Sequence, residues 1–276
     1  MESVRLVICD VDGTLFDWTN RVLSPKTKEI IKELKRKGVY FALASGRSVS
    51  EIKPYAQEWG FDYQFDFLMG QNGAELYIPK EDKKYEYFLL KKEWIQEILK
   101  VMEPFECNPF CFYHDDGMLC KVHDEMIDRS IATSKRTPIV AKEMSDFWEI
   151  ENAKIMFRMK EELTPIVEKY LEEHPFEYYK GFKTQSTLIE FMDKRISKGY
   201  GLKKLCEITG ISIDEVVAYG DTTNDNEMLK VAGLGVCLKN GSEDTKAIAD
   251  EITKQVCTED GFANHVEECL FPIINK

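Results

Sequence analysis

No long apolar run occurs in the 276 residues of this sequence. A helix that crosses a lipid bilayer needs about 20 consecutive, mostly apolar residues, so this absence argues against a helical membrane span. The first residues also lack the basic region, apolar stretch and small-residue cleavage site of a secretory signal, because a strand pattern begins almost at once. We therefore expect a cytoplasmic protein without a membrane partner.

A surplus of positive charge is also absent. Lysine and arginine total 37 residues against 49 aspartates and glutamates, which gives a formal net charge of -12 and an isoelectric point near 5.0. Proteins that bind nucleic acid hold its phosphate backbone mainly with an excess of lysine and arginine. The composition therefore argues against a nucleic-acid partner.

Cysteine is present, with eight residues, but its placement does not suggest a disulfide framework. Cys9, Cys206 and Cys237 lie inside apolar strand or helix patterns, which is typical of small buried hydrophobic residues. The chain is 43% hydrophobic and 31% charged, and it is long enough to form two hydrophobic cores. A globular chain of this size does not need disulfides to be stable.

A denser group of cysteines and histidines lies at positions 107–123. Residues 115–117, Asp-Asp-Gly, are typical of a hairpin turn. With the last two as the turn residues, Tyr113 faces Cys120 across the hairpin. Side-chain alternation then puts Cys111 and Cys120 on one face and the two histidines on the other, which disfavours a tetrahedral zinc site.

The first motif that carries chemistry is LVICDVDGTL at residues 6–15. An apolar strand delivers Asp10 at its carboxyl end, a turn brings Asp12 alongside, and Gly13 lets the backbone approach an anion closely. Two acids so close repel each other unless a cation or a shared proton separates them. The pattern indicates phosphoryl transfer, with Asp10 as nucleophile beside Mg²⁺ and Asp12 as general acid and base. The alternative is a plain turn after a strand.

A second acidic motif, VVAYGDTTNDNEM, follows at residues 216–228. It repeats the order of strand and then carboxylate. Asp221 and Asp225 lie four residues apart across a strand end and a helix start, so both can face one hard cation. Asn224 is placed to hold a ligand oxygen or to orient the carboxylates. The alternative is an acidic helix N-terminus that complements the helix dipole.

The order of patterns along the chain predicts a doubly wound, mostly parallel, Rossmann-like α/β sheet with an inserted α+β domain. Strands are expected at 4–9, 39–44 and 66–69, and helices at 25–37 and 48–59. A second alternating run begins near Leu188. We expect a core domain of residues 1–80 and 188–276 and an inserted cap of residues 81–187, with ligands bound at the carboxyl ends of the strands.

Further residues with site chemistry lie at the ends of these patterns. Ser45 and Gly46 follow an apolar strand, where a hydroxyl and backbone N–H groups can converge on a phosphate oxygen; a plain helix cap is the alternative. Arg47 can add a bidentate contact to phosphate or to substrate. Lys198 precedes a helix, where a cation is tolerable beside an aspartate and a phosphate. Asn72, in the turn Gly-Gln-Asn-Gly, is a candidate for contact with substrate.

Four segments together resemble the motifs of the haloacid dehalogenase superfamily, and most closely those of its Cof-like sugar-phosphatase branch. They are DVDGT at 10–14, ASGR at 44–47, SKGYGL at 197–202 and GDTTNDNEM at 220–228. The resemblance implies that Asp10 is the nucleophile, Asp12 the acid and base, Ser45 a phosphate ligand and Lys198 a charge stabiliser. It also implies a Mg²⁺ site whose ligands are Asp10, the backbone carbonyl of Asp12, Asp221 and, directly or through another ligand, Asp225, with Asn224 in support.

We therefore expect a Mg²⁺-dependent phosphatase that hydrolyses small phosphomonoesters through an aspartyl phosphate. The phosphate-binding candidates are Gly13, Gly46, Arg47, Asn72 and Asn224. A phosphosugar mutase with the same nucleophile and a non-catalytic sensor of phosphorylated ligands remain alternatives. A sugar phosphate, a phosphorylated cofactor or a nucleotide would each be compatible, and the oligomeric state stays open, since Trp94 and Trp148 suit a pocket, a dimer contact or core packing.

Overall fold

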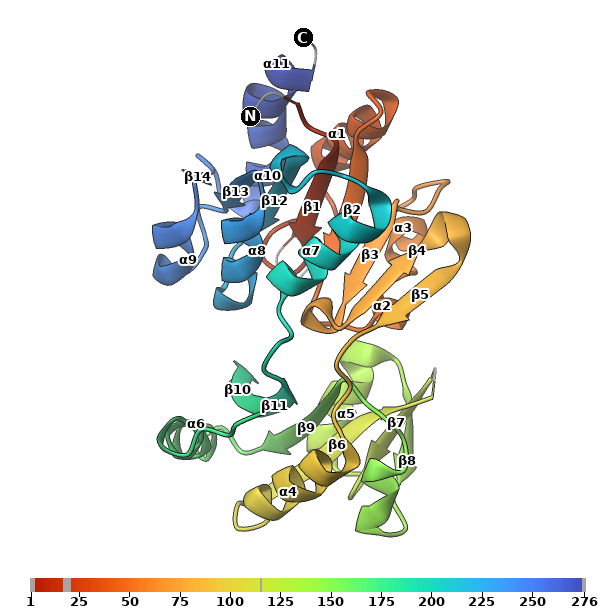
Figure 1. The fold of residues 1–276 in the computed structure, drawn as a ribbon, viewed down its shortest axis with the longest axis vertical. Coiled ribbons are helices and arrows are strands. Elements are labelled where there is room, and N and C mark those ends of the chain that lie inside the picture. The colour runs from red at the N-terminus through yellow and green to blue at the C-terminus, as the bar shows by residue number, and fades with distance from the viewer. Residues whose placement is uncertain (1–2, 17–20, 115, 275–276) are drawn as a thin grey trace. The chain divides into compact units, whose positions relative to one another are not determined.

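The computed structural model describes residues 3–16, 21–114 and 116–274, which form two compact units (Figure 1). The core unit joins the two ends of the chain, Met1–Glu86 and Ile196–Lys276. The inserted unit is the segment between them, Tyr87–Arg195. The chain therefore leaves the core unit once and returns to it once.

Within the described residues, the core unit contains an eight-stranded sheet with the order β14-β13-β12-β1-β2-β3-β4-β5. The strands from β14 to β3 run parallel, and β4 and β5 continue the sheet as an antiparallel hairpin. The expected α/β fold class is confirmed. The strands are β1 (Leu6–Asp10), β2 (Tyr40–Ala44), β3 (Phe67–Gly70), β4 (Glu75–Ile78), β5 (Lys83–Glu86), β12 (Val216–Gly220), β13 (Leu234–Cys237) and β14 (Glu251–Ile252).

Helices cover this sheet, and alternate residues of its strands meet them. Val7 and Cys9 of β1 belong to one apolar cluster with Ile31 and Phe262, which come from α1 and α10. The helices of the core unit are α1 (Pro25–Arg36), α2 (Val49–Ile52), α3 (Tyr55–Glu58), α7 (Lys198–Thr209), α8 (Asn226–Val231), α9 (Glu243–Ile248), α10 (Gly261–His265) and α11 (Phe271–Ile274), with a π-helical segment at Val266–Leu270.

The ends of the first two helical regions follow from local chemistry. The Ser24 side chain accepts a hydrogen bond from the Thr27 N–H at 2.9 Å, so α1 begins where a cap and a first-turn proline predict it. The single helix expected at 48–59 is wrong, because two short helices, α2 and α3, occupy this range. Pro54 lies between them, and its missing N–H and fixed φ interrupt a continuous helix.

The inserted unit contains a six-stranded sheet in the described residues, with the order β10-β11-β9-β6-β7-β8. Its strands are antiparallel except for the pair β7 and β8. Trp94 and Trp148 pack against its main apolar cluster, which favours the core-packing alternative for both. The elements are α4 (Lys92–Met102), β6 (Cys107–Tyr113), β7 (Gly117–Cys120), α5 (Glu125–Ser134), β8 (Thr137–Val140), β9 (Lys154–Met159), α6 (Thr164–Glu173), β10 (Tyr179–Gln185) and β11 (Leu188–Asp193).

The register expected for the cysteine-containing hairpin is wrong. Tyr113 pairs with Gly117, and Cys120 pairs with Phe110 instead of Tyr113. His114 adopts a left-handed φ of 54° and so belongs to the turn, while Asp115 lies outside the described residues. The register differs from the expected one by an odd number of residues, which reverses the faces, so Cys111 and Cys120 belong to different apolar clusters.

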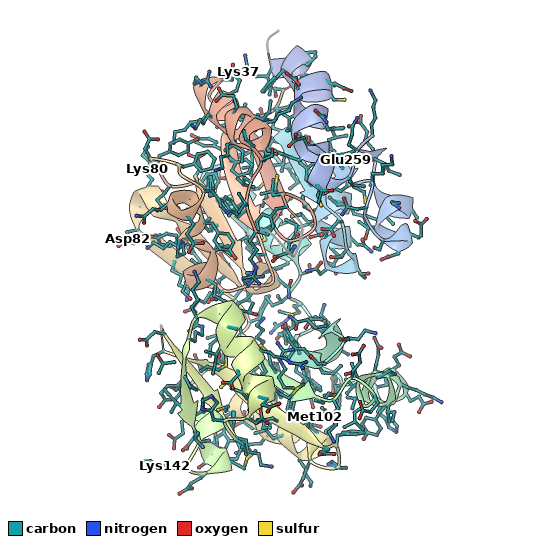
Figure 2. All side chains as sticks on the ribbon, turned by 180° about the vertical axis from the view of Figure 1, so that it is seen from behind. Lys37, Lys80, Asp82, Met102, Lys142 and Glu259 are labelled. Carbon is teal, nitrogen blue, oxygen red and sulfur yellow. The ribbon has the colours of Figure 1, made fainter. Side chains whose placement is uncertain are left out.

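The unit boundaries also differ from the expected ones at 80/81 and 187/188. The hairpin of β4 and β5 extends the core sheet through Glu86, and Lys80 and Asp82 lie on the core unit in Figure 2. The strand β11, placed in the core by its sequence pattern, pairs with β9 and β10 of the inserted unit. Among the described helices, none has the length and apolar character that a membrane crossing requires.

Candidate active site

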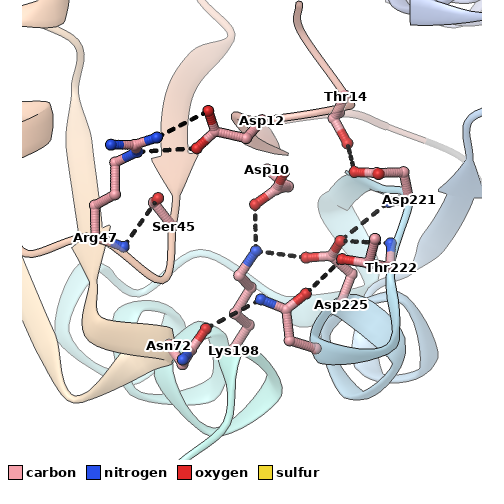
Figure 3. Close-up of polar contacts among 11 residues, drawn as sticks. Asp10, Asp12, Thr14, Ser45, Arg47, Asn72, Lys198, Asp221, Thr222 and Asp225 are labelled. Carbon is pink, nitrogen blue, oxygen red and sulfur yellow. Dashed lines mark hydrogen bonds and ion pairs between the residues drawn. The ribbon is translucent and has the colours of Figure 1, made fainter. Parts of the chain in front are cut away.

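Parallel pairing brings the carboxyl ends of three strands to one edge of the core sheet. β1 lies between β2 and β12, and both of these neighbours run parallel to it. Asp10 is the last residue of β1 and is level with Ala44 of β2, so Ser45 follows directly beside it. Asp221 comes directly after β12. Residues far apart in the sequence thereby form one polar cluster (Figure 3).

Lys198 joins two carboxylates of this cluster. It is the first residue of α7, it is fully buried, and its Nζ donates hydrogen bonds to Oδ1 of Asp10 and, at 2.6 Å, to Oδ1 of Asp225. Burial lowers the pKa of the lysine, but the charges of Asp10 and Asp225 outweigh burial and raise it. Lys198 therefore remains a cation inside the protein.

Three buried carboxylates surround this one lysine. Oxygens of Asp10, Asp221 and Asp225 lie within 4.8 Å of one another. Burial raises the pKa of Asp10 well above its usual range, against the opposing charge of Lys198. Burial and then the charge of Asp225 raise the pKa of Asp221 to about 7. One lysine does not offset three carboxylates, and an all-oxygen donor set of this kind fits a hard divalent cation such as Mg²⁺.

The two aspartates that follow β12 have different surroundings. Oδ2 of Asp225 accepts hydrogen bonds from the backbone N–H of Asp221 at 3.0 Å and of Thr222 at 3.2 Å, while its Oδ1 is bonded to Lys198. Oδ1 of Asp221 accepts a hydrogen bond from the Thr14 hydroxyl at 2.8 Å. Asp225 is therefore positioned to hold the loop and Lys198, and Asp221 is the better candidate for direct contact with a metal ion.

Close backbone packing supports this arrangement. Gly13 has a φ of +93°, and a Cβ atom there would lie 2.3 Å from Oδ2 of Asp221. A Cβ atom at Gly220 would lie 2.4 Å from the Cβ of Asp225. Any larger residue at either position would displace an aspartate of the cluster.

Arg47 binds Asp12, a contact that the sequence did not predict. Its Nε donates to Oδ2 at 2.9 Å and its Nη2 donates to Oδ1 at 3.1 Å. Both side chains are about nine-tenths buried. Burial lowers the pKa of Arg47, but the contact with Asp12 outweighs it and raises the pKa. The structure thus gives Arg47 a carboxylate partner, and its contact with phosphate or substrate stays a prediction.

Ser45 and Asn72 meet at the end of β2. The Ser45 hydroxyl accepts a hydrogen bond from the Arg47 N–H at 3.1 Å. The Ser45 backbone carbonyl accepts one from the Asn72 N–H at 3.0 Å. A Cβ atom at Gly46 would lie 3.3 Å from Oδ1 of Asn72. The same Oδ1 accepts a hydrogen bond from Nδ2 of Asn224 at 3.1 Å. Every candidate named from the sequence therefore lies in this region.

The backbone at Asn72 is strained. Gln71 and Asn72 have φ values of 47° and 56°, in the left-handed region that residues with a Cβ seldom adopt. Each such residue costs on the order of 1–3 kcal/mol, and strain of this kind persists where the surrounding structure enforces it.

Two residues that contact the site were not predicted from the sequence. Thr14 lies within a quoted motif but received no role, and Asn240, whose Nδ2 donates to the Gly13 carbonyl at 2.8 Å, belongs to no motif.

A family model described as haloacid dehalogenase-like hydrolase matches residues 7–266. The chain belongs to this family. This match confirms the membership of the haloacid dehalogenase superfamily that the four motifs predicted. The match covers both the core unit and the inserted unit, so the insertion is part of the family pattern.

The chain is also similar, over almost its whole length, to curated proteins and to solved structures. The 5-amino-6-(5-phospho-D-ribitylamino)uracil phosphatase YitU of Bacillus subtilis is 25% identical, over 95% of this chain and 96% of its own. The structure of TM0651 from Thermotoga maritima has a TM-score of 0.83 at 25% identity and covers 96% of this chain and 97% of that one. A HAD subclass IIB sugar phosphatase, BT4131, shares the fold with a TM-score of 0.80 at 20% identity, over 98% of this chain and all of that one.

Proposed function

We propose that this hydrolase is a Mg²⁺-dependent phosphatase that acts on small phosphomonoesters, such as sugar phosphates, through a phosphorylated Asp10. One observation carries the proposal. Lys198 joins Asp10 to Asp225 at the carboxyl edge of the sheet, in a cluster with more buried carboxylates than cations. Packing alone does not require a buried lysine between two carboxylates, in a group that holds more acids than cations.

The residues would hold the metal and the phosphate as follows. Asp10, Asp221 and the carbonyl of Asp12 would bind Mg²⁺, which when bound supplies a Lewis acid that offsets charge on the transferring phosphoryl group. Ser45, Asn72 and Asn224 offer a hydroxyl and amides for the phosphate oxygens. Ser45 follows the β2 residue that is level with Asp10, and the side chains of Asn72 and Asn224 are hydrogen-bonded to each other.

The chemistry then has two steps. An oxygen of ionised Asp10 attacks phosphorus in line, the bond from phosphorus to the ester oxygen breaks, and Asp12 gives a proton to the leaving alcohol. A water molecule next attacks the phosphoryl group on Asp10, and Asp12 takes the proton of that water, which releases inorganic phosphate and restores Asp10. Lys198 offsets negative charge near Asp10 in both steps.

Arg47 has a place in this scheme. A guanidinium pairs with a carboxylate in its ionised form, which is the form that Asp12 needs as a base. We propose that an incoming phosphate competes for one of the two Arg47 hydrogen bonds, so that Asp12 can take up a proton for the first step while the other bond keeps it in position.

Two further proposals concern the whole protein. The inserted unit is proposed to set substrate specificity. The protein is proposed to act in the cytoplasm.

The test measures the inorganic phosphate that is released from p-nitrophenyl phosphate. The wild-type protein is assayed with Mg²⁺ and with a chelator, and the variant Asp10→Asn is assayed with Mg²⁺. Loss of activity with the chelator and in the variant supports the proposal. Asp214→Asn is the matched control, because it makes the same change at an exposed aspartate away from the cluster. Near-normal activity of a folded Asp10→Asn protein would refute the mechanism.

A further inference from the structure

A second cluster of metal-binding residue types lies in the core unit and shares no residue with the carboxylate cluster. Glu251 is in β14, the strand at the edge of the sheet. His265 ends α10, and Cys269 follows in the π-helical segment Val266–Leu270. All three side chains line a pocket of about 240 Å³. Short π-helical segments occur often at functional sites in proteins.

The ligand atoms of this cluster are already close together. A carboxylate oxygen of Glu251, a ring nitrogen of His265 and the sulfur of Cys269 lie within 4.8 Å of one another. Nε2 of His265 is 2.8 Å from Oε2 of Glu251. Zinc bonds to nitrogen and oxygen measure about 2.0–2.2 Å, so a tetrahedral ion requires these two atoms to separate by only about 0.6 Å.

A tyrosine hydroxyl contacts the imidazole of His265 and orients it. Its Nδ1 lies 2.8 Å from the hydroxyl of Tyr219, which is fully buried in β12. When Nδ1 carries the ring proton and donates it to this hydroxyl, Nε2 presents its lone pair to the pocket. Histidines that bind metals in proteins are oriented in this way by a partner at the other ring nitrogen.

The charges around the pocket also favour a cation. The carboxylates of Glu251 and Glu268 place negative charge near the sulfur of Cys269, and Lys254 places positive charge there. Lys254 is itself paired with Glu268 at 2.6 Å, which leaves the charge of Glu251 without a lysine partner in this group. A set with one nitrogen, one sulfur and one oxygen ligand differs from the all-oxygen set at Asp10, and it suits zinc better than magnesium.

We propose that Glu251, His265 and Cys269 bind one zinc ion, with water from the pocket in the fourth position. The ion would tie the edge strand β14 to the C-terminal helical segment. This site and the phosphatase site are independent, so failure of one proposal leaves the other intact.

The first test uses the whole wild-type protein. Bound metal is removed first, and excess Mg²⁺ is then added to saturate the all-oxygen cluster. Zinc is added, and the rate at which iodoacetamide alkylates each cysteine is followed by mass spectrometry of peptides. We expect zinc to slow the alkylation of Cys269 severalfold and to leave Cys107, half-buried in the inserted unit, unchanged. An unchanged rate at Cys269 overturns the proposal.

The second test counts zinc ions bound per chain by calorimetry, again in excess Mg²⁺. Cys269→Ser and His265→Gln should each bind one zinc ion fewer than the wild type, while Cys107→Ser should bind as many. Tyr219→Phe should keep the site but weaken it about 10-fold, as expected for a residue that orients a ligand. If Cys269→Ser binds zinc as the wild type does, or if zinc binding is lost only in Asp221→Asn, the proposal is wrong.

Discussion

Arg47 and Asp12 form two hydrogen bonds, at 2.9 Å from Nε and 3.1 Å from Nη2, in a buried part of the site. This geometry fixes both the position and the orientation of the carboxylate that is proposed to move protons. A lysine makes only point contacts and cannot reproduce the fork of the guanidinium.

Arg47→Lys is therefore expected to lower kcat roughly 100-fold while the fold is retained, because a misplaced catalytic group costs about that much. Steady-state hydrolysis of p-nitrophenyl phosphate measures the effect. Arg36→Lys, at a solvent-exposed arginine of α1, is the control. An unchanged kcat in Arg47→Lys would remove Arg47 from the proposed scheme.

Lys198→Met is expected to destabilise the core unit as well as to stop turnover. It leaves Asp10 and Asp225 buried without their cation, and breaking a buried ion pair in this way costs about 3–5 kcal/mol. Urea unfolding measures the free energy of unfolding, with Lys203→Met, at an exposed lysine of the same helix, as the control. Equal stability of the two variants would show that Lys198 does not offset the buried acids.

The stability of the metal-free protein is expected to fall as the pH rises from about 4 to about 7. Burial and Asp225 raise the pKa of Asp221 from 3.8 to about 7, so the folded protein holds a proton that the unfolded chain has released in this range. Each such proton contributes a slope of up to about 1.4 kcal/mol per pH unit.

Mg²⁺ should flatten this dependence, since a bound cation stabilises the ionised carboxylates. Urea unfolding at several pH values, with chelator and with Mg²⁺, provides the comparison. Asp221→Asn should flatten the chelator curve too. A metal-free protein that becomes more stable between pH 4 and pH 7 would contradict the assigned titration.

Two substitutions at Asn72 separate its backbone role from its side-chain role. Asn72→Gly tolerates the left-handed φ of 56° and loses only the amide that contacts Asn224, so it should fold with near-normal stability and show a raised KM. Asn72→Ala loses the same amide and adds about 1 kcal/mol of backbone strain. Thermal unfolding and steady-state kinetics distinguish the two effects. If Asn72→Gly keeps the wild-type KM, the amide does not contact substrate.

The sequence predicted the central elements because their signals are local. β1 and α1 follow from an apolar run and from a Ser-Pro cap, and the motif carboxylates lie where their strands end. The break at Pro54 could have been read from the same local rules. The turn at His114 could not, because a left-handed histidine leaves no pattern in the sequence. The resulting odd shift in register reversed the faces of the hairpin.

Local sequence rules do not predict contacts between distant segments. Nothing in the sequence shows that Arg47 meets Asp12, since an arginine beside a phosphate motif suits either a phosphate or a carboxylate. The pattern of β11 predicts a buried strand but not its partner, so it was assigned to the wrong sheet. Asn240, which contacts the Gly13 carbonyl, lies in a loop with no recognisable motif.

The position of β1 between β2 and β12 has a consequence for synthesis of the protein. A chain emerging from the ribosome can pair β1 with β2 early, but the other edge of β1 stays open until Val216–Gly220 has been made. The whole inserted unit is translated in between. An apolar strand with an open edge invites pairing with other chains, so we expect the nascent protein to depend on chaperones until β12 arrives.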